Sequence, residues 1–260
     1  MNKGIDSSRG RYLARMDADD IALPDRLESQ LAYLKANNLD AVGGLVDIID
    51  LDGHSVPSMR RYQHWLNSCQ TPEAIRVNRF IECPIVNPTA LAKRSVFEHR
   101  FQANTFPEDY DFWLKRLAEG CTIGKVDKVV LHWRDSSDRL TRCHKNYTTS
   151  AFDACRKHHL IQGPLAEVST IDFWGAGQTG KPWIRWFQKT DITIRKIYEV
   201  SPKKIGQKIH GVPVFAPDDL LFSERYPLII AVGAAGAREQ IEPFIQQRGY
   251  TLGKDAWFVA

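Results

Sequence analysis

An apolar strand that runs directly into a glycine-rich turn and a helix is the feature that most limits the fold of this chain. Residues 171–174 (Ile-Asp-Phe-Trp) predict the strand, because they are largely apolar and end at the first of three closely spaced glycines. The same order of strand, turn and helix continues through segments 175–180, 181–189, 192–200 and 228–232. Strands that alternate with helices pair in parallel, so this part is expected to be a small Rossmann-like α/β domain.

The turn after the first strand has the spacing Gly175-x-Gly177-x-x-Gly180, and the acid Glu199 follows at the end of the next strand. This is the pattern of a dinucleotide-binding turn, in which the backbone and a helix N-terminus approach a phosphate. A single motif of this kind is weak, so a nucleotide-like ligand and a purely structural role are equally open. We identify no residue for hydride transfer, which disfavours a dehydrogenase or an epimerase.

The dipeptide Gly163-Pro164 is the clearest domain boundary in the sequence. A chain of 260 residues with 43% hydrophobic content has the length of one large or two small domains. We therefore expect a first domain over residues 1–162 and the Rossmann-like domain over residues 166–260.

The first domain begins with a short predicted strand, residues 11–16, that ends in the acids Asp17, Asp19 and Asp20. Carboxylates this close together supply the hard oxygen ligands that Mg²⁺ or Mn²⁺ needs when it also holds a diphosphate. The alternative is a solvated turn that caps the helix beginning near Pro24. Taken alone, these residues favour the solvated turn, and only the rest of the domain reverses that balance.

Further elements follow the acidic cluster. Leu27, Leu31 and Leu34 repeat at helical spacing. Another helix begins at the two acids Glu108 and Asp109, where negative charge is favoured electrostatically. The other expected elements are strands at 41–49 and 126–133, an extended segment at 84–91, and helices at 71–80 and 144–162.

The stretch GRYLARMDADDIALPDRL (residues 10–27) resembles the sugar-nucleotide-binding strand and helix of family 2 glycosyltransferases of the GT-A fold. The similarity continues in order through Asn87-Pro88-Thr89, Arg94-Ser95, residues 107–113 and the strand of residues 129–134. Several ordered motifs at family-like spacing are more specific than any one of them. The resemblance covers most of the first domain and implies a nucleotide-diphospho-sugar transferase fold.

Carried over by position, the resemblance implies a donor site at the acidic strand end. Asp17 matches the acid that faces the nucleoside, Asp19 the contact to the metal or the β-phosphate, and Asp20 a supporting acid. Arg134 and Arg139 lie where relatives have a basic loop over the diphosphate, and a solvated loop is an equal alternative. The implied donor is a nucleoside-diphosphate sugar, held with Mn²⁺ or Mg²⁺.

Asp109 matches the family's catalytic base, and Glu108 precedes it as in the family. In inverting members this base takes the proton from the acceptor hydroxyl as that oxygen attacks the anomeric carbon. A metal neutralises the charge on the departing diphosphate, so separate carboxylates serve the two tasks. The alternative is that both acids only favour a helix start.

Two features depart from the family pattern. Relatives begin with a further strand, helix, strand and helix that form much of the nucleoside pocket, so we expect an incomplete GT-A domain. A late start, a gene remnant or completion by another chain would each account for this. Asn87 also stands where many relatives carry a histidine.

The second domain has a resemblance of its own. Residues 205–206, residues 211–214 and the later turn at Gly233 make it similar to the small N-terminal domain of sugar O-acyltransferases of the sialic-acid acetyltransferase class. The resemblance implies that the domain holds a nucleotide or a nucleotide sugar.

Charge and cysteine content bound the setting. The chain has 35 basic and 31 acidic residues, a net charge of +4, and the two signs are interspersed along the sequence. This pattern does not favour nucleic acid as a partner. Five scattered cysteines without a Cys-x-x-Cys pair fit a reducing cytoplasm, and no run reaches the ~18 apolar residues of a spanning helix. His144, His158 and His159 have no partners at metal-binding spacing and are expected at the surface.

Together these features predict a metal-dependent, inverting glycosyltransferase that acts from the cytoplasm. The resemblance implies a glycan or lipid-linked acceptor in lipopolysaccharide or capsule synthesis, and the modest basic excess is compatible with a peripheral position at the inner face of a membrane. The alternative is a non-catalytic module that binds a nucleotide or a nucleotide sugar after truncation of the catalytic domain.

Overall fold

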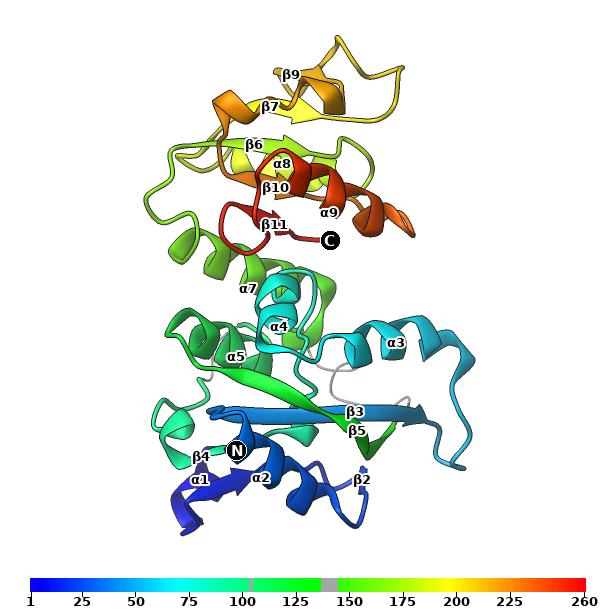
Figure 1. The fold of residues 1–260 in the computed structure, drawn as a ribbon, viewed down its shortest axis with the longest axis vertical. Helices are drawn as coiled ribbons and strands as arrows, with labels where there is room; N and C mark the ends of the chain where they lie inside the picture. Colours follow the sequence, from blue (N-terminus) through cyan, green and yellow to red (C-terminus); the bar gives the residue numbers. More distant parts are fainter. Residues whose placement is uncertain (103–104, 137–144) are drawn as a thin grey trace. The chain divides into compact units, whose positions relative to one another are not determined.

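The computed structural model describes residues 1–102, 105–136 and 145–260. The chain divides into two compact units, each built around its own β-sheet: unit 1 comprises residues 1–79 and 83–159, and unit 2 comprises residues 80–82 and 160–260 (Figure 1). The α/β class expected from the sequence is confirmed in both. Among the described helices, none is both long and apolar enough to span a bilayer.

Unit 1 contains a mixed sheet with the strand order β1-β4-β3-β5-β2. Its centre is a long parallel pair, β3 and β5, while β1, β2 and β4 pair in the antiparallel sense. The strands are β1 (Tyr12–Ala14), β2 (Ile21–Ala22), β3 (Ala41–Ile49), β4 (Leu91–Lys93) and β5 (Ile123–Arg134). The acidic segment thus lies between β1 and β2, at one end of this sheet.

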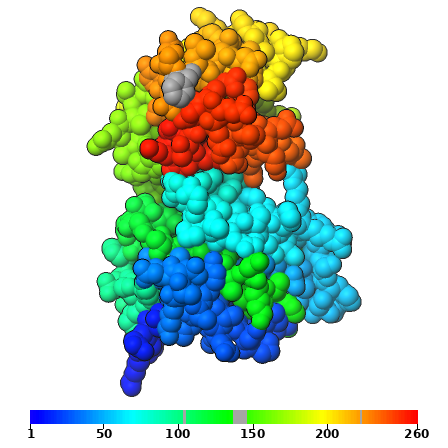
Figure 2. Space-filling view, in the orientation of Figure 1, coloured from blue at the N-terminus to red at the C-terminus, as the bar shows by residue number. Residues whose placement is uncertain are grey.

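Helices cover both faces of the central pair: in Figure 1, α2 lies on one side of β3 and β5, and α3, α4 and α5 lie on the other. Aromatic rings pack under α5, where the ring centroids of Phe101 and Phe112 are 4.2 Å apart. The helix α1 has no buried residue and belongs to the dark-blue N-terminal segment in Figure 2. The helices are α1 (Asn2–Ser7), α2 (Arg26–Ala36), α3 (Arg60–Ser68), α4 (Pro72–Asn78), α5 (Glu108–Ala118) and α7 (Thr149–Gln162), the last of which crosses the division between the units.

One local expectation needs correction. Residues 84–91 are not simply extended, because Asn87–Thr89 form a 3₁₀ turn, η2, before β4 begins. Pro88 presets its own φ for such a turn, and the carbonyl of Asn87 accepts the N–H of Ala90 at 3.0 Å. The helix that the leucine spacing predicted is confirmed as α2, in which Arg26, Gln30 and Leu34 are buried and Leu27 is 55% exposed.

Unit 2 contains the expected parallel sheet, with the order β11-β10-β6-β7-β9-β8 and one antiparallel edge pair, β8 with β9. Its elements are β6 (Thr170–Trp174), α8 (Gly180–Phe187), β7 (Thr193–Tyr198), β8 (Lys208–Ile209), β9 (Val212–Phe215), β10 (Leu228–Ile230), α9 (Ala237–Gln247) and β11 (Ala256–Phe258).

The turn between β6 and α8 accepts only glycine at two positions. Gly175 has φ +104°, and a β-carbon there would lie 2.6 Å from the carbonyl oxygen of Ala231. A β-carbon on Gly180 would lie 1.9 Å from the carbonyl oxygen of Gly175. These two glycines therefore let the turn pack tightly against the end of β10.

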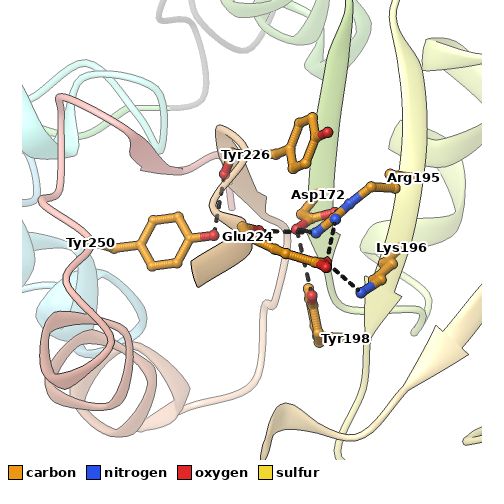
Figure 3. Close-up of polar contacts among 7 residues, drawn as sticks. All are labelled: Asp172, Arg195, Lys196, Tyr198, Glu224, Tyr226 and Tyr250. Carbon is orange, nitrogen blue, oxygen red and sulfur yellow. Dashed lines mark hydrogen bonds and ion pairs between the residues drawn. The ribbon is translucent and has the colours of Figure 1, made fainter. Parts of the chain in front are cut away.

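A buried ion pair joins the two central strands of unit 2 (Figure 3). Asp172 of β6 is fully buried, and Arg195 of β7 donates to both of its carboxylate oxygens at 3.0 and 2.8 Å. Arg195 also donates to Glu224 at 2.9 Å, and its guanidinium lies 4.1 Å from the ring centre of Tyr226. The hydrogen bonds to Asp172 hold the pKa of Arg195 above its ordinary value.

Candidate active site

The three acids after β1 come together in space. Oxygens of Asp17, Asp19 and Asp20 lie within 4.8 Å of one another, with Asp19 exposed, Asp17 half-buried and Asp20 buried. A hard divalent cation such as Mg²⁺ or Mn²⁺ prefers oxygen donors of this kind, and the exposed Asp19 leaves the cluster open to a ligand. The residues present therefore fit the metal that the sequence predicts.

Arg26 holds the backbone just before the acidic segment. Its buried side chain, in the first turn of α2, donates to the carbonyl of Arg15 at 2.7 Å and to Gln30 at 3.1 Å. Asp20 accepts the backbone N–H of Arg134, at the end of β5, at 3.0 Å. The contribution of Arg134 that the structure describes is thus to hold Asp20, and its contact with a donor stays a prediction.

The other predicted acids begin α5. Asp109 is half-buried and accepts the N–H of Tyr110 at 2.9 Å. Burial, and then the neighbouring charge of Glu108, raise the pKa of Asp109 to about 6. Glu108 accepts the phenol hydroxyl of Tyr147 at 2.5 Å, and burial raises the pKa of Tyr147. Tyr147 was not predicted, because it contacts Glu108 only through the tertiary fold.

Arg15 connects the two groups of acids. It forms an ion pair with Asp17, and its positive charge also acts on Asp109, where it lowers the pKa against the larger effect of burial. The same charge acts on Tyr147. The charge of this guanidinium therefore acts on groups at the acidic strand end and at the start of α5, which are far apart in the sequence. Arg15 also escaped prediction, since the sequence shows only a basic residue within a strand.

Two further predicted residues lie in the core of unit 1. Asn87 is buried and accepts the indole N–H of Trp113 at 3.3 Å. Trp113 is itself buried, as expected of a core residue. The side-chain oxygen of Asn87 therefore already has a hydrogen-bond partner within the protein. Arg139 and His144 lie outside the described residues.

Unit 2 contains a cavity at the carboxyl ends of β6, β7 and β10. Its volume is about 540 Å³, and the lining includes Gly175, Gly177, Glu199, Lys204 and Gly233. A β-carbon on Gly177 would meet nothing within 4 Å, so this residue borders open space. The predicted glycine turn thus faces a cavity where a phosphate could approach the helix N-terminus.

Both carboxylate oxygens of Glu199 have partners within the chain. One accepts the N–H of Ala176 at 2.9 Å and the ammonium of Lys204 at 3.0 Å. The other accepts the N–H groups of Val200 and Ser201 at 3.0 and 3.2 Å. Glu199 thereby supports the glycine turn from the end of β7, and its direct contact with a ligand stays a prediction.

Two family models match separate parts of the chain. Residues 1–101 match the family model described as glycosyl transferase family 2, and residues 169–250 match the model described as CoA binding domain. The bifunctional glycosyltransferase pgtA of Dictyostelium discoideum is 27% identical over 232 residues, which are 75% of this chain and 29% of pgtA. The O-antigen biosynthesis glycosyltransferase WbnJ of Escherichia coli is 30% identical over 149 residues, which are 56% of this chain and 51% of WbnJ.

Among the solved structures that match is that of Staphylococcus aureus TarS in complex with UDP-GlcNAc. It is 15% identical, with a TM-score of 0.43, and the match covers 62% of this chain and 46% of that one. The chain thus spans about half or less of the length of each of these proteins. Over residues 1–101 the chain is thus similar to glycosyltransferase family 2, and over residues 169–250 it is similar to CoA binding domains.

Proposed function

We propose that unit 1 transfers a sugar from a nucleoside-diphosphate sugar to a hydroxyl of a glycan or lipid-linked acceptor, with inversion at the anomeric carbon. The observation that carries the proposal is the cluster of Asp17, Asp19 and Asp20 after β1, whose carboxylate oxygens lie within 4.8 Å of one another. Two relatives, WbnJ and the amylovoran biosynthesis glycosyltransferase AmsE of Erwinia amylovora, are named for surface polysaccharides. We therefore infer a role in surface polysaccharide synthesis on the cytoplasmic side of a membrane.

Asp109 is the group we assign to the acceptor proton. A carboxylate with a pKa of about 6 is mostly ionised at pH 7 and is a stronger base than an ordinary aspartate. Glu108, held by the hydroxyl of Tyr147, keeps a second negative charge beside it. The acceptor hydroxyl would lose its proton to Asp109 as its oxygen forms the new bond to the anomeric carbon.

Asp17, Asp19 and Asp20 would hold Mn²⁺ or Mg²⁺ beside the donor diphosphate. Such a cation, when bound, offsets the negative charge that the departing diphosphate gains. Asp19 is the most exposed of the three acids, whereas Asp20 holds the end of β5. We therefore assign the ligand role first to Asp19 and the positioning role to Asp20.

Replacement of Asp19 by asparagine tests the donor site. We expect Asp19→Asn to lower the affinity for Mn²⁺ by roughly tenfold to a hundredfold and to lower Mn²⁺-dependent hydrolysis of the donor in parallel. The measurement is hydrolysis of UDP-linked and GDP-linked sugars, with Mn²⁺ varied. Asp127, an exposed aspartate on β5, provides the matched control, and Asp127→Asn should behave like the wild type.

Equal hydrolysis by both variants, with equal Mn²⁺ dependence, would remove the acidic segment from the donor site. Donor binding without any turnover in the wild-type chain would instead favour the alternative of a non-catalytic binding module. Loss of folded structure in Asp19→Asn is not expected, because its side chain is exposed.

We further propose that the cavity of unit 2 binds a nucleotide-like ligand. Its support is the glycine turn that borders the cavity and the match to the CoA binding domain model. Coenzyme A, NAD⁺ and UDP-GlcNAc serve as probes in calorimetric titrations. We expect Gly177→Val to abolish the binding seen in the wild type, because the new side chain would occupy the open space at the turn. Asp19→Asn should leave this binding unchanged. Binding that survives Gly177→Val would show that the glycine turn is not part of the binding site.

A further inference from the structure

A cluster of three different side chains lies between α5 and α7, and sugar transfer as described above does not use it. Oδ1 of Asp111 is 2.8 Å from Nε2 of His159, and Sγ of Cys155 completes a group whose potential ligand atoms all lie within 4.8 Å of one another. His159 was expected at the surface, and this prediction is wrong, since its side chain is only 12% exposed. His158, by contrast, is exposed.

The fold brings the three groups together through two helices. Cys155 and His159 are four residues apart on α7, so their side chains leave the same face of that helix. Asp111 lies in the first turn of α5, two residues after Asp109, and is buried. The rings of Tyr110 and Phe152 pack between the same helices, with centroids 5.8 Å apart. The cluster is thus held by rigid elements on both sides.

The three side chains could serve either as a nucleophile with its partners or as ligands of a metal ion. Cys155 is 0% exposed, so its sulfur is poorly placed as a nucleophile that must reach a substrate. A set of one thiol, one imidazole and one carboxylate is instead suited to Zn²⁺, which accepts sulfur, nitrogen and oxygen ligands. Mg²⁺ and Mn²⁺ prefer oxygen donors, so this cluster and the acidic strand end would select different cations.

We propose that Asp111, Cys155 and His159 form a Zn²⁺ site that ties α7 to the first turn of α5. The thiolate and the carboxylate would carry the charge that balances the cation, and the imidazole would bind through Nε2. The bound cation would fix the turn that carries Asp109. Among the described residues this cluster is separate from the one formed by Asp17, Asp19 and Asp20, so the two sites can be tested independently.

Cobalt serves as the spectroscopic probe for this site. The full chain, without a histidine tag, is stripped with a chelator, dialysed and titrated with Co²⁺. We expect stoichiometric binding with a thiolate-to-cobalt charge-transfer band that added Zn²⁺ removes. Cys155→Ser should lose the band, and His159→Gln should weaken binding by more than about a hundredfold, because each removes a ligand. Cys121→Ser, which changes a half-buried thiol outside the cluster, should retain the band.

Circular dichroism decides which variants are folded, and His159→Gln alone is decisive if Cys155→Ser does not fold. Absence of a thiolate band in the wild type would overturn the proposal and leave the cluster as a hydrogen-bonded helix contact. A band that survives in folded His159→Gln with unchanged affinity would overturn it as well. Cobalt binding that is lost in Asp19→Asn but kept in Cys155→Ser would place the cation at the acidic strand end instead.

Discussion

Asp109→Asn is expected to lower the turnover of the wild-type enzyme by about 10²–10⁴-fold, because it removes the group that takes the acceptor proton. Donor binding should be nearly unchanged, since the variant leaves Asp17, Asp19 and Asp20 in place. The same substitution removes a half-buried negative charge beside Glu108 and so should not destabilise the start of α5. The measurement is the rate of sugar transfer to an acceptor extract at saturating donor.

The pH profile gives the sharper test of the same residue. A base acts only when it is unprotonated, so the wild-type rate should be low below pH 6 and reach a plateau above it, following the raised pKa of about 6. The residual rate of Asp109→Asn should lack this step. Glu73→Gln, which changes an exposed acid in the first turn of α4, should keep both the rate and the step. A step that persists in Asp109→Asn would assign the titration to another group.

The second large effect concerns stability. Arg195→Met should lower the free energy of opening of unit 2 by about 3–5 kcal/mol, because it leaves the carboxylate of Asp172 buried without its partner. Since a chain of two units need not unfold in one step, hydrogen exchange of peptides from β6 and β7 is the appropriate measurement. Lys196→Met is the control, because Lys196 pairs with the exposed Glu224 at 3.4 Å, and the loss of such an exposed pair should have a much smaller effect.

A double variant separates the charge from the packing. Asp172→Leu combined with Arg195→Met removes both charges and should recover most of the lost stability, since a buried ion pair is often replaceable by apolar side chains. Equal effects of Arg195→Met and Lys196→Met would contradict the importance of the buried pair. No recovery in the double variant would mean that packing around Arg195, including Tyr226, matters more than charge.

The parts that the sequence predicted are those determined by local pattern. The long strand β3 is confirmed at residues 41–49, because a β-branched run reads directly as buried strand. The helix α5 begins at Glu108, as the paired acids indicated. The glycine turn of unit 2 also follows from spacing alone, since Gly175 and Gly180 have steric reasons to be glycine. The assigned roles of these residues in binding remain predictions.

The parts that were missed depend on contacts between distant segments. Nothing in the sequence around Arg26 indicates that its side chain is buried against the acidic segment, where it donates to the carbonyl of Arg15. Lys125 is 1% exposed and donates to the carbonyl of Leu66, and burial lowers its pKa to about 8. Its position in β5 reads from sequence as an ordinary exposed lysine. Tertiary packing decided each of these cases.

The four hydrogen bonds of Glu199 affect the entropy cost of binding a ligand in the cavity of unit 2. A loop that must be ordered by its ligand gives up conformational entropy on binding, and this loss is subtracted from the affinity. Here the side chain of Glu199 already links the end of β7 to the backbone of Ala176 in the glycine turn. The turn is therefore preorganised, so a ligand that fits the cavity would lose little of its interaction energy to ordering the turn.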